Sequence, residues 1–324
     1  MVSRIVPHIR RAWVVGPKNG YRQIASGEWI IFRSEKVWPQ YLRWILVGDM
    51  FHAAFMQTVS GVGGSLLRAR PAEVFKIKIP IPPLTEQKRI AAILDAADAL
   101  RTKRRESLAQ LDTLLQSTFL EMFGDPVTNS MKWKKFSLDD VCEKIIDCPH
   151  STPKWADYGV ICLRTSNLGK GEWIWDEIRY VSEEDYAERT KRGEISKDDI
   201  ILSREGTVGV LALVDDGVRL CMGQRLVQLR TNQSILSPKF VLYILLHDLA
   251  PERLARLMAG STSKHINVKE LRSLPIIMPP LDLQHRFAAI VESVGKQKSR
   301  LRTHLTELDA LFASLQARAF NGEL

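Results

Sequence analysis

The chain has 324 residues, of which 45% are hydrophobic and 26% charged, as in ordinary globular proteins long enough for two domains. Lysine and arginine (46) outnumber aspartate and glutamate (37), and the formal charge of +9 suits a polyanionic partner such as nucleic acid. No apolar run approaches the roughly 18 residues of a membrane span and no secretory signal follows Met1, so we expect a cytoplasmic protein.

Residues 1–84 are predicted to form an incomplete first globular domain. The start, "MVSR", resembles "ILSR" at 201–204, and "WPQYLRWIL" at 38–46 resembles "SPKFVLYIL" at 237–245. The first copy shows no counterpart of the front part of the second. Either the true start lies upstream, or the chain is a truncated product, or another chain supplies the rest. The candidate DNA ligands of this segment are Arg4, Arg10 and Arg11.

Residues 85–123 are predicted to form one long helix. Pro82 and Pro83 suit the approach to a helix, Thr85 is a good N-cap, and no proline or glycine follows until Gly124. At 1.5 Å per residue this helix is about 58 Å long. A domain of ordinary size cannot cover so long an apolar stripe, so we expect the helix to pair with another.

Residues 124–281 are predicted to form the complete second domain, with short strands such as "GVICLRTSNL" and "DIILSREGTVGVLALV" and an inserted helix. Polar and basic residues gather at the strand ends, and such side chains reach phosphates and base edges. Taken singly, each is better explained as part of a solvated turn; as a set in a basic chain, they favour DNA contact. The candidates are Lys154, Arg164, Thr165, Ser166, Asn167, Lys170, Ser203, Arg204, Thr207, Gln224, Arg225, Ser263, Lys264 and His265.

Residues 282–321 are predicted to form a second long helix. Its start, "PPLDLQHRFAAIV" at 279–291, matches "PPLTEQKRIAAIL" at 82–94 without a gap, at an offset of 197. Apolar residues recur at alternating spacings of three and four, which indicates a coiled-coil seam. We therefore predict an α+β fold whose domains are separated by two long helices pairing as an antiparallel coiled coil, a spacer between the domains. The seam is assigned to Ile93, Leu94, Leu108, Leu111, Leu115, Ile290, Val294, Leu301, Leu305, Leu308, Phe312 and Leu315.

These features together resemble the specificity subunit of type I restriction-modification systems, which serve in phage defence. The resemblance is carried by "PIPPLTEQKRIAAIL" (80–94), "LLQSTFLEMFGDP" (114–126), "LRTSNL", "DDIILSREGTVG" and the terminal "LQARAFNGEL". The second proline-proline motif departs from the first, with Leu283 where Glu86 stands. The resemblance extends over nearly the whole chain, apart from the front half of the first target-recognition domain.

The resemblance implies a binding protein without an active site of its own. Each target-recognition domain would read one half of a bipartite DNA site. The paired helices would dock modification subunits, which bring S-adenosylmethionine and methylate adenine, and restriction subunits that use ATP with magnesium would join the complex. No cofactor is expected in this chain.

The sequence shows no pattern of an enzyme. It contains no G-x-x-x-x-G-K-[ST] phosphate loop, and the acidic pairs Asp139-Asp140 and Asp198-Asp199 have no lysine or histidine arrangement of a nuclease. Four cysteines, at 142, 148, 162 and 221, lack zinc-site spacing, so we expect reduced thiols and no metal. Two alternatives stay open: a coiled-coil scaffold that binds only proteins, and a truncated or half specificity subunit without independent function.

Overall fold

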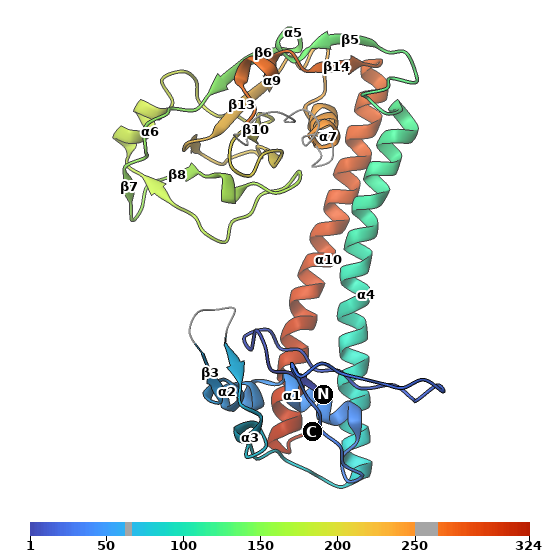
Figure 1. Ribbon diagram of the computed structural model, residues 1–324. Coiled ribbons are helices and arrows are strands. Elements are labelled where there is room, and N and C mark those ends of the chain that lie inside the picture. Colours follow the sequence, from blue (N-terminus) through green and yellow to red (C-terminus); the bar gives the residue numbers. More distant parts are fainter. Residues whose placement is uncertain (62–66, 250–264) are drawn as a thin grey trace. The chain divides into compact units, whose positions relative to one another are not determined.

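The computed structural model describes residues 1–61, 67–249 and 265–324, and these form two compact units (Figure 1). Unit 1 comprises Met1–Ala109 and Lys298–Leu324, and unit 2 comprises Gln110–Gln297. The two long helices, α4 (Leu84–Phe123) and α10 (Leu281–Asn321), each contribute to both units. Within the described residues, none of the helices combines the length and apolar character of a bilayer span.

Unit 1 packs short helices and two-stranded ladders against the first part of α4 and the last part of α10. A core that includes Tyr41, Trp44, Leu94 and Phe312 joins these elements. The strands are β1 (Val2–Ser3), β2 (Trp29–Ile30), β3 (Val59–Ser60) and β4 (Arg68–Ala69), and the short helices are α1 (Pro39–Val47), α2 (Asp49–Gln57) and α3 (Pro71–Val74).

Unit 2 contains two four-stranded sheets, ordered β11-β10-β13-β6 and β12-β8-β9-β7, and a β14-β5 ladder beside the start of α10 (Figure 1). Runs of mainly antiparallel strands are interrupted by a few short helices, which confirms the predicted α+β class. The strands are β5 (Lys134–Ser137), β6 (Cys142–Asp147), β7 (Trp155–Ala156), β8 (Val160–Leu163), β9 (Tyr180–Val181), β10 (Ile200–Ser203), β11 (Leu211–Leu213), β12 (Leu220–Met222), β13 (Leu226–Thr231) and β14 (Pro275–Met278). The helices are α5 (Leu138–Val141), the 3-10 helix η1 (Thr165–Asn167), α6 (Glu183–Arg189), α7 (Pro238–Asp248) and α9 (Val268–Arg272).

The long helices end at the predicted residues, and each starts one residue earlier than predicted. Gly124 and Gly322 have φ of 73° and 77°, and this left-handed conformation, which glycine adopts without strain, ends each helix. The Gly124 N–H donates to the Leu120 carbonyl at 2.8 Å, as expected for a helix-terminating turn.

The two long helices pair antiparallel. In unit 1, the Arg101 and Arg105 guanidinium groups of α4 lie 2.5 and 3.0 Å from the Asp309 carboxylate of α10. In unit 2, the rings of Phe119 and Phe123 near the end of α4 each lie 5.5 Å from the ring of Phe287 near the start of α10. Residue numbers thus rise along one helix as they fall along the other, as predicted.

The apolar seam residues named from the sequence are all buried or half-buried. Leu94 and Phe312 belong to the core of unit 1. In contrast, Leu100, Leu114 and Leu311, which lie off the predicted seam, are 48–54% exposed. Burial therefore follows the predicted period of the helices, because only one stripe of each helix meets apolar partners.

The internal repeat extends to individual hydrogen bonds. In unit 2, the Arg204 N–H donates to the Arg225 carbonyl at 3.0 Å, and the Ile266 N–H donates to the Arg204 carbonyl at 2.8 Å. Unit 1 contains the same pair of bonds, from Arg4 to the Glu28 carbonyl and from Ala69 to the Arg4 carbonyl, both at 2.9 Å. The two units therefore share a backbone plan as well as a helix motif.

A buried glutamine at the start of each long helix fastens that helix to its unit. The Gln87 side chain accepts from the Trp38 N–H at 2.7 Å and donates to the carbonyls of Lys36 and Pro82 at 3.1 and 2.8 Å. The sequence motif aligned Gln87 with its repeat, Gln284, but gave no sign of this role.

Gln284 makes the matching contacts in unit 2. It accepts from the Ser237 N–H at 2.8 Å and donates to the carbonyls of Ile235 and Pro279 at 3.3 and 2.9 Å. Both glutamines are at most 1% exposed, so each network satisfies polar groups that water does not reach.

Candidate nucleic-acid interface

In the first sheet of unit 2, three loops meet at one end of neighbouring strands. The antiparallel strands β6, β13 and β10 are neighbours, and their register pairs Asp147 with Val227 and Ser203 with Leu226. The loops after β6 and β10 and the loop before β13 therefore start side by side, because adjacent antiparallel strands place these ends together.

The second sheet adds one further loop here, because the loop before β13 is also the loop that follows β12. β8 and β12 run parallel and pair Leu163 with Met222, so the loops that follow them also begin together. The Gly223 N–H donates to the Leu163 carbonyl at 2.8 Å, and a Cβ at residue 223 would lie only 2.6 Å from that oxygen, so glycine is required. We refer to residues 148–154, 164–171, 204–209, 223–225 and His265 as the loop edge.

Arg204 is the centre of the loop edge, but its charge is already paired. Its guanidinium donates to both oxygens of the Asp147 carboxylate, at 2.9 and 3.3 Å, and its side chain is 11% exposed. With its backbone bonds to Arg225 and Ile266, this residue connects three loops. We therefore interpret Arg204 as holding the edge in shape, and the predicted direct DNA contact stays a prediction.

Two other predicted DNA ligands are buried. Asn167 is 2% exposed, and its amide donates to the carbonyls of Ile174 and Glu177 at 3.1 and 3.2 Å. Ser203 is fully buried, and its hydroxyl donates to the Glu205 carbonyl at 3.2 Å. Their polar atoms are thus used to fix the loop conformations, and they leave no exposed group for a ligand.

The remaining predicted ligands of unit 2 differ in how freely they reach solvent. Arg164 is held by the Glu177 carboxylate at 3.1 Å, and Gln224 donates to the His150 carbonyl at 2.6 Å. Thr165 is half-buried. Ser263 and Lys264 lie outside the described residues. The exposed members are Lys154, Ser166, Lys170, Thr207, Arg225 and His265.

Arg225 stands out among the exposed residues. Its side chain is 57% exposed, and its nearest carboxylate, that of Glu205, is 3.9 Å away. Its φ of 69° is rare for a residue with a side chain. Such strain is retained where the surrounding structure imposes it, often at functional sites.

In unit 1 the three predicted arginines have different surroundings. Arg10 pairs with Asp49 at 2.5 Å and donates to the Val47 carbonyl at 3.2 Å. Arg4 is half-buried and donates to the Gly27 carbonyl at 3.4 Å, whereas Arg11 is exposed.

Sequence reasoning missed several residues that shape the loop edge. Asp147 was not singled out, although it pairs with Arg204 and lies 3.4 Å from the imidazole of His150. Burial raises the pKa of the Cys148 thiol, and its sulfur accepts from the Leu226 N–H at 3.4 Å. The repeated Ser-Arg dipeptide was the one available signal that residue 204 has a structural role.

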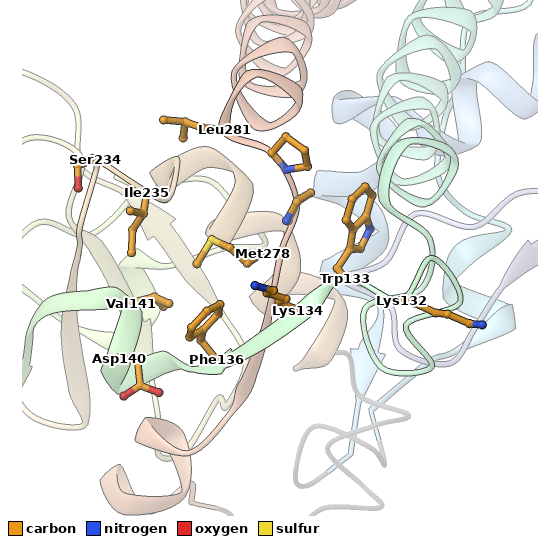
Figure 2. A pocket seen from close by; sticks show the side chains of 12 residues that line it. Lys132, Trp133, Lys134, Phe136, Asp140, Val141, Ser234, Ile235, Met278 and Leu281 are labelled. Carbon is orange, nitrogen blue, oxygen red and sulfur yellow. The ribbon is translucent and has the colours of Figure 1, made fainter.

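A separate open groove of about 1030 Å³ lies between β5, β14 and the start of α10 (Figure 2). Phe136 and Met278 give it an apolar lining, with Lys134 beside them, while Lys132 extends away in Figure 2. The Asp140 carboxylate in its lining accepts from the Ser137 hydroxyl and N–H, which lowers the pKa of Asp140. This carboxylate serves as a helix cap, so it is not poised for acid–base chemistry.

Comparison with known proteins gives a consistent result. The family profile described as "Type I restriction modification DNA specificity domain" matches residues 52–111 and 131–308. The specificity subunit of the type I restriction enzyme MjaVIII of Methanocaldococcus jannaschii is 24% identical over 67% of this chain and 55% of that protein. The EcoKI specificity subunit of Escherichia coli is 24% identical over 81% of this chain and 61% of that protein. The chain thus spans little more than half the length of these relatives.

Two solved structures share the fold. One belongs to a study of complex assembly and conformational transition in the type I R-M system, with a TM-score of 0.57, 22% identity, and coverage of 90% of this chain and 73% of that one. The other is the S subunit of a type I restriction-modification system from M. genitalium, with a TM-score of 0.54, 15% identity, and coverage of 88% and 73%. At these identities the likeness is one of fold.

Proposed function

Since the chain belongs to the type I restriction modification DNA specificity domain family, we propose that it binds double-stranded DNA in a sequence-specific manner as the non-catalytic specificity subunit of a type I complex. The observation that supports this most directly is the loop edge. It gathers loops from both sheets of unit 2 within the part of the chain that the family profile covers.

The chemistry of the loop edge fits a nucleic acid. Lys154, Lys170 and Arg225 are exposed there, and among the described residues neither lysine has an ion-pair partner. Exposed cations neutralise phosphates and position a protein on a duplex. Gln224 and Arg225 are the residue types that form bidentate bonds to adenine and guanine in the major groove.

The finer parts of the proposal concern the complex. We propose that unit 2 reads one half of a bipartite site, that the paired helices α4 and α10 set the unread spacing, and that these helices dock modification subunits. Restriction subunits would join the same complex. S-adenosylmethionine, ATP and magnesium would belong to those partners, which would methylate or cut the DNA. The relatives are named as specificity subunits, which supports this division of labour.

The first test is the salt dependence of binding to a random-sequence duplex, measured with the modification subunits present. The double variant Lys154→Gln and Lys170→Gln should bind more weakly, because two phosphate contacts and their released counterions are lost. The slope of log K against log salt concentration should become shallower by about 1.8, or roughly 0.9 for each phosphate contact.

Lys197→Gln provides the matched control. Lys197 is exposed, pairs with Asp216 at 3.3 Å, and precedes β10 at the end opposite to the loop edge. Its replacement should leave the slope unchanged. Equal slopes for the double variant and the unaltered chain would show that these loop-edge lysines do not contact DNA.

A further inference from the structure

In unit 2, one continuous segment, β5–α5–β6 (Lys134–Asp147), contacts the rest of the unit at three places. β5 pairs along β14, β6 pairs along β13, and the terminal Asp147 carboxylate pairs with Arg204. The internal repeat puts counterparts of β14, β13 and Arg204 in unit 1. Each of these counterparts is open among the described residues.

The first open place is the stretch 77–81 between α3 and α4, which aligns with β14 at the offset of 197. In unit 2 the Leu138 N–H donates to the Leu274 carbonyl at 2.9 Å, so every second residue from 274 faces β5. The equivalent residues in unit 1 are 77, 79 and 81. No described residue accepts from the N–H of Ile79 or Ile81, and Ile81 is 53% exposed. Pro80 falls at a position whose N–H would face away, so it does not block pairing.

The second open place is the stretch 30–34, "IIFRS", which aligns with the β13 residues 227–231. In unit 2, β13 lies between β10 and β6. In unit 1, the counterpart of β10 is present, since β1 pairs with β2, but among the described residues no strand covers the other side of β2. Ile31 is 47% exposed there.

The third open place is Arg4, the counterpart of Arg204. The Nε of Arg204 donates to Asp147 at 2.9 Å, whereas the Nε of Arg4 is buried and has no hydrogen-bond partner among the described residues. A buried donor without an acceptor destabilises the folded chain, and more so when it carries charge. A carboxylate at this place would remove that destabilisation.

Exposed apolar residues mark the surface between these places. Phe75 takes the position of Arg272, which in unit 2 pairs with Asp139 of α5. Phe75 is 59% exposed and its ring contacts that of Phe32 at 5.4 Å. The surface therefore offers two strand edges, apolar side chains and one arginine whose buried Nε lacks an acceptor to a single occupant.

We propose that unit 1 binds a strand–turn–strand segment of a second polypeptide, which pairs with residues 77–81 and 30–34 and places a carboxylate on Arg4. Within these 324 residues, the segment of this kind already pairs in unit 2, its β5 with β14 and its β6 with β13, so the occupant that we propose belongs to a different polypeptide, not to a second copy, and has the same chemistry. Strand addition to an exposed edge gives affinity through main-chain hydrogen bonds. This inference does not depend on DNA binding.

The test uses the full chain and a fluorescein-labelled synthetic peptide of residues 132–149 carrying Cys142→Ser and Cys148→Ser. Fluorescence anisotropy should show saturable binding. Ile81→Pro in the chain should weaken the peptide's affinity at least about tenfold, because it removes an N–H that faces the added strand. Lys78→Pro is the matched control and should change the affinity less than about twofold, since residue 78 aligns with Pro275 of β14.

A second measurement does not depend on the proline variants. Asp147→Asn in the peptide should weaken binding to the unaltered chain about tenfold. It should have little effect on binding to the Arg4→Met chain, because the guanidinium that would pair with the carboxylate is then absent. Three results would overturn the proposal: no binding up to about 1 mM peptide, equal affinity for the Ile81→Pro chain, or an Asp147→Asn effect that persists with Arg4→Met. A chain that is already a dimer, and that Ile81→Pro makes monomeric, would show that the occupant is a second copy and would overturn it as well.

Discussion

Phe287→Ala is expected to lower the free energy of unfolding of unit 2 by about 3–5 kcal/mol, the usual cost of removing a fully buried aromatic ring. The Phe287 ring is 0% exposed and lies 5.5 Å from Phe119, 5.5 Å from Phe123 and 5.1 Å from Tyr243. It therefore joins the end of α4, the start of α10 and α7. Urea unfolding followed by circular dichroism measures the change.

Leu114→Ala is the control for this prediction. Leu114 lies on α4 within the same unit and is 48% exposed, so its truncation should change the free energy of unfolding by no more than about 0.5 kcal/mol. Equal effects of the two substitutions would contradict the assignment of Phe287 to the junction of the three helices.

Gln284→Leu is expected to destabilise unit 2 by about 3 kcal/mol, although leucine is similar in size to glutamine. The substitution leaves the buried Ser237 N–H without an acceptor and removes donors from the carbonyls of Ile235 and Pro279. Each buried group left unsatisfied costs about 1–3 kcal/mol, and the gain from a more apolar side chain offsets part of this. Urea unfolding again gives the measurement.

Gln297→Leu serves as the matched control, because Gln297 is an exposed glutamine of α10 in the same unit. Its replacement should change the free energy of unfolding by no more than about 0.5 kcal/mol. A stable Gln284→Leu chain would show that the hydrogen bonds of this glutamine do not hold the helix to its unit.

The long helices were the most predictable part of the fold. Proline pairs, N-cap residues and a terminal glycine act locally, so they set the ends of α4 and α10 to within one residue. The repeat at an offset of 197 then aligned the two helices, and an apolar stripe too long for one domain predicted their pairing. The end signals depend on residues close together in the sequence, and the repeat needs only a comparison of two such local patterns.

The loop edge was less predictable. The sequence indicated which loops are polar, but it could not show that Asn167 and Ser203 turn inward to fix their own loops. The partner of Arg204 is Asp147, 57 residues away, and that pairing depends on the register of β6 and β13. Strand register is set by packing over the whole sheet, which a local pattern does not reveal.

The repeat was more informative than its sequence similarity suggested. "MVSR" matched "ILSR" in only two residues, yet Ser3 and Ser203 both donate to the carbonyl two residues ahead, at 3.1 and 3.2 Å. The offset is 200 at this point and 197 in the helices, because the intervening loops differ in length. A backbone plan can thus persist after most side chains have changed.

Sequence-specific DNA reading is tested most directly by mapping adenine methylation across the genome of cells that contain the modification subunits, with and without this chain. We expect a single sequence motif, methylated only when the chain is present, because the chain would choose the site while its partners perform the chemistry. Identical methylation maps in the two strains would contradict that claim.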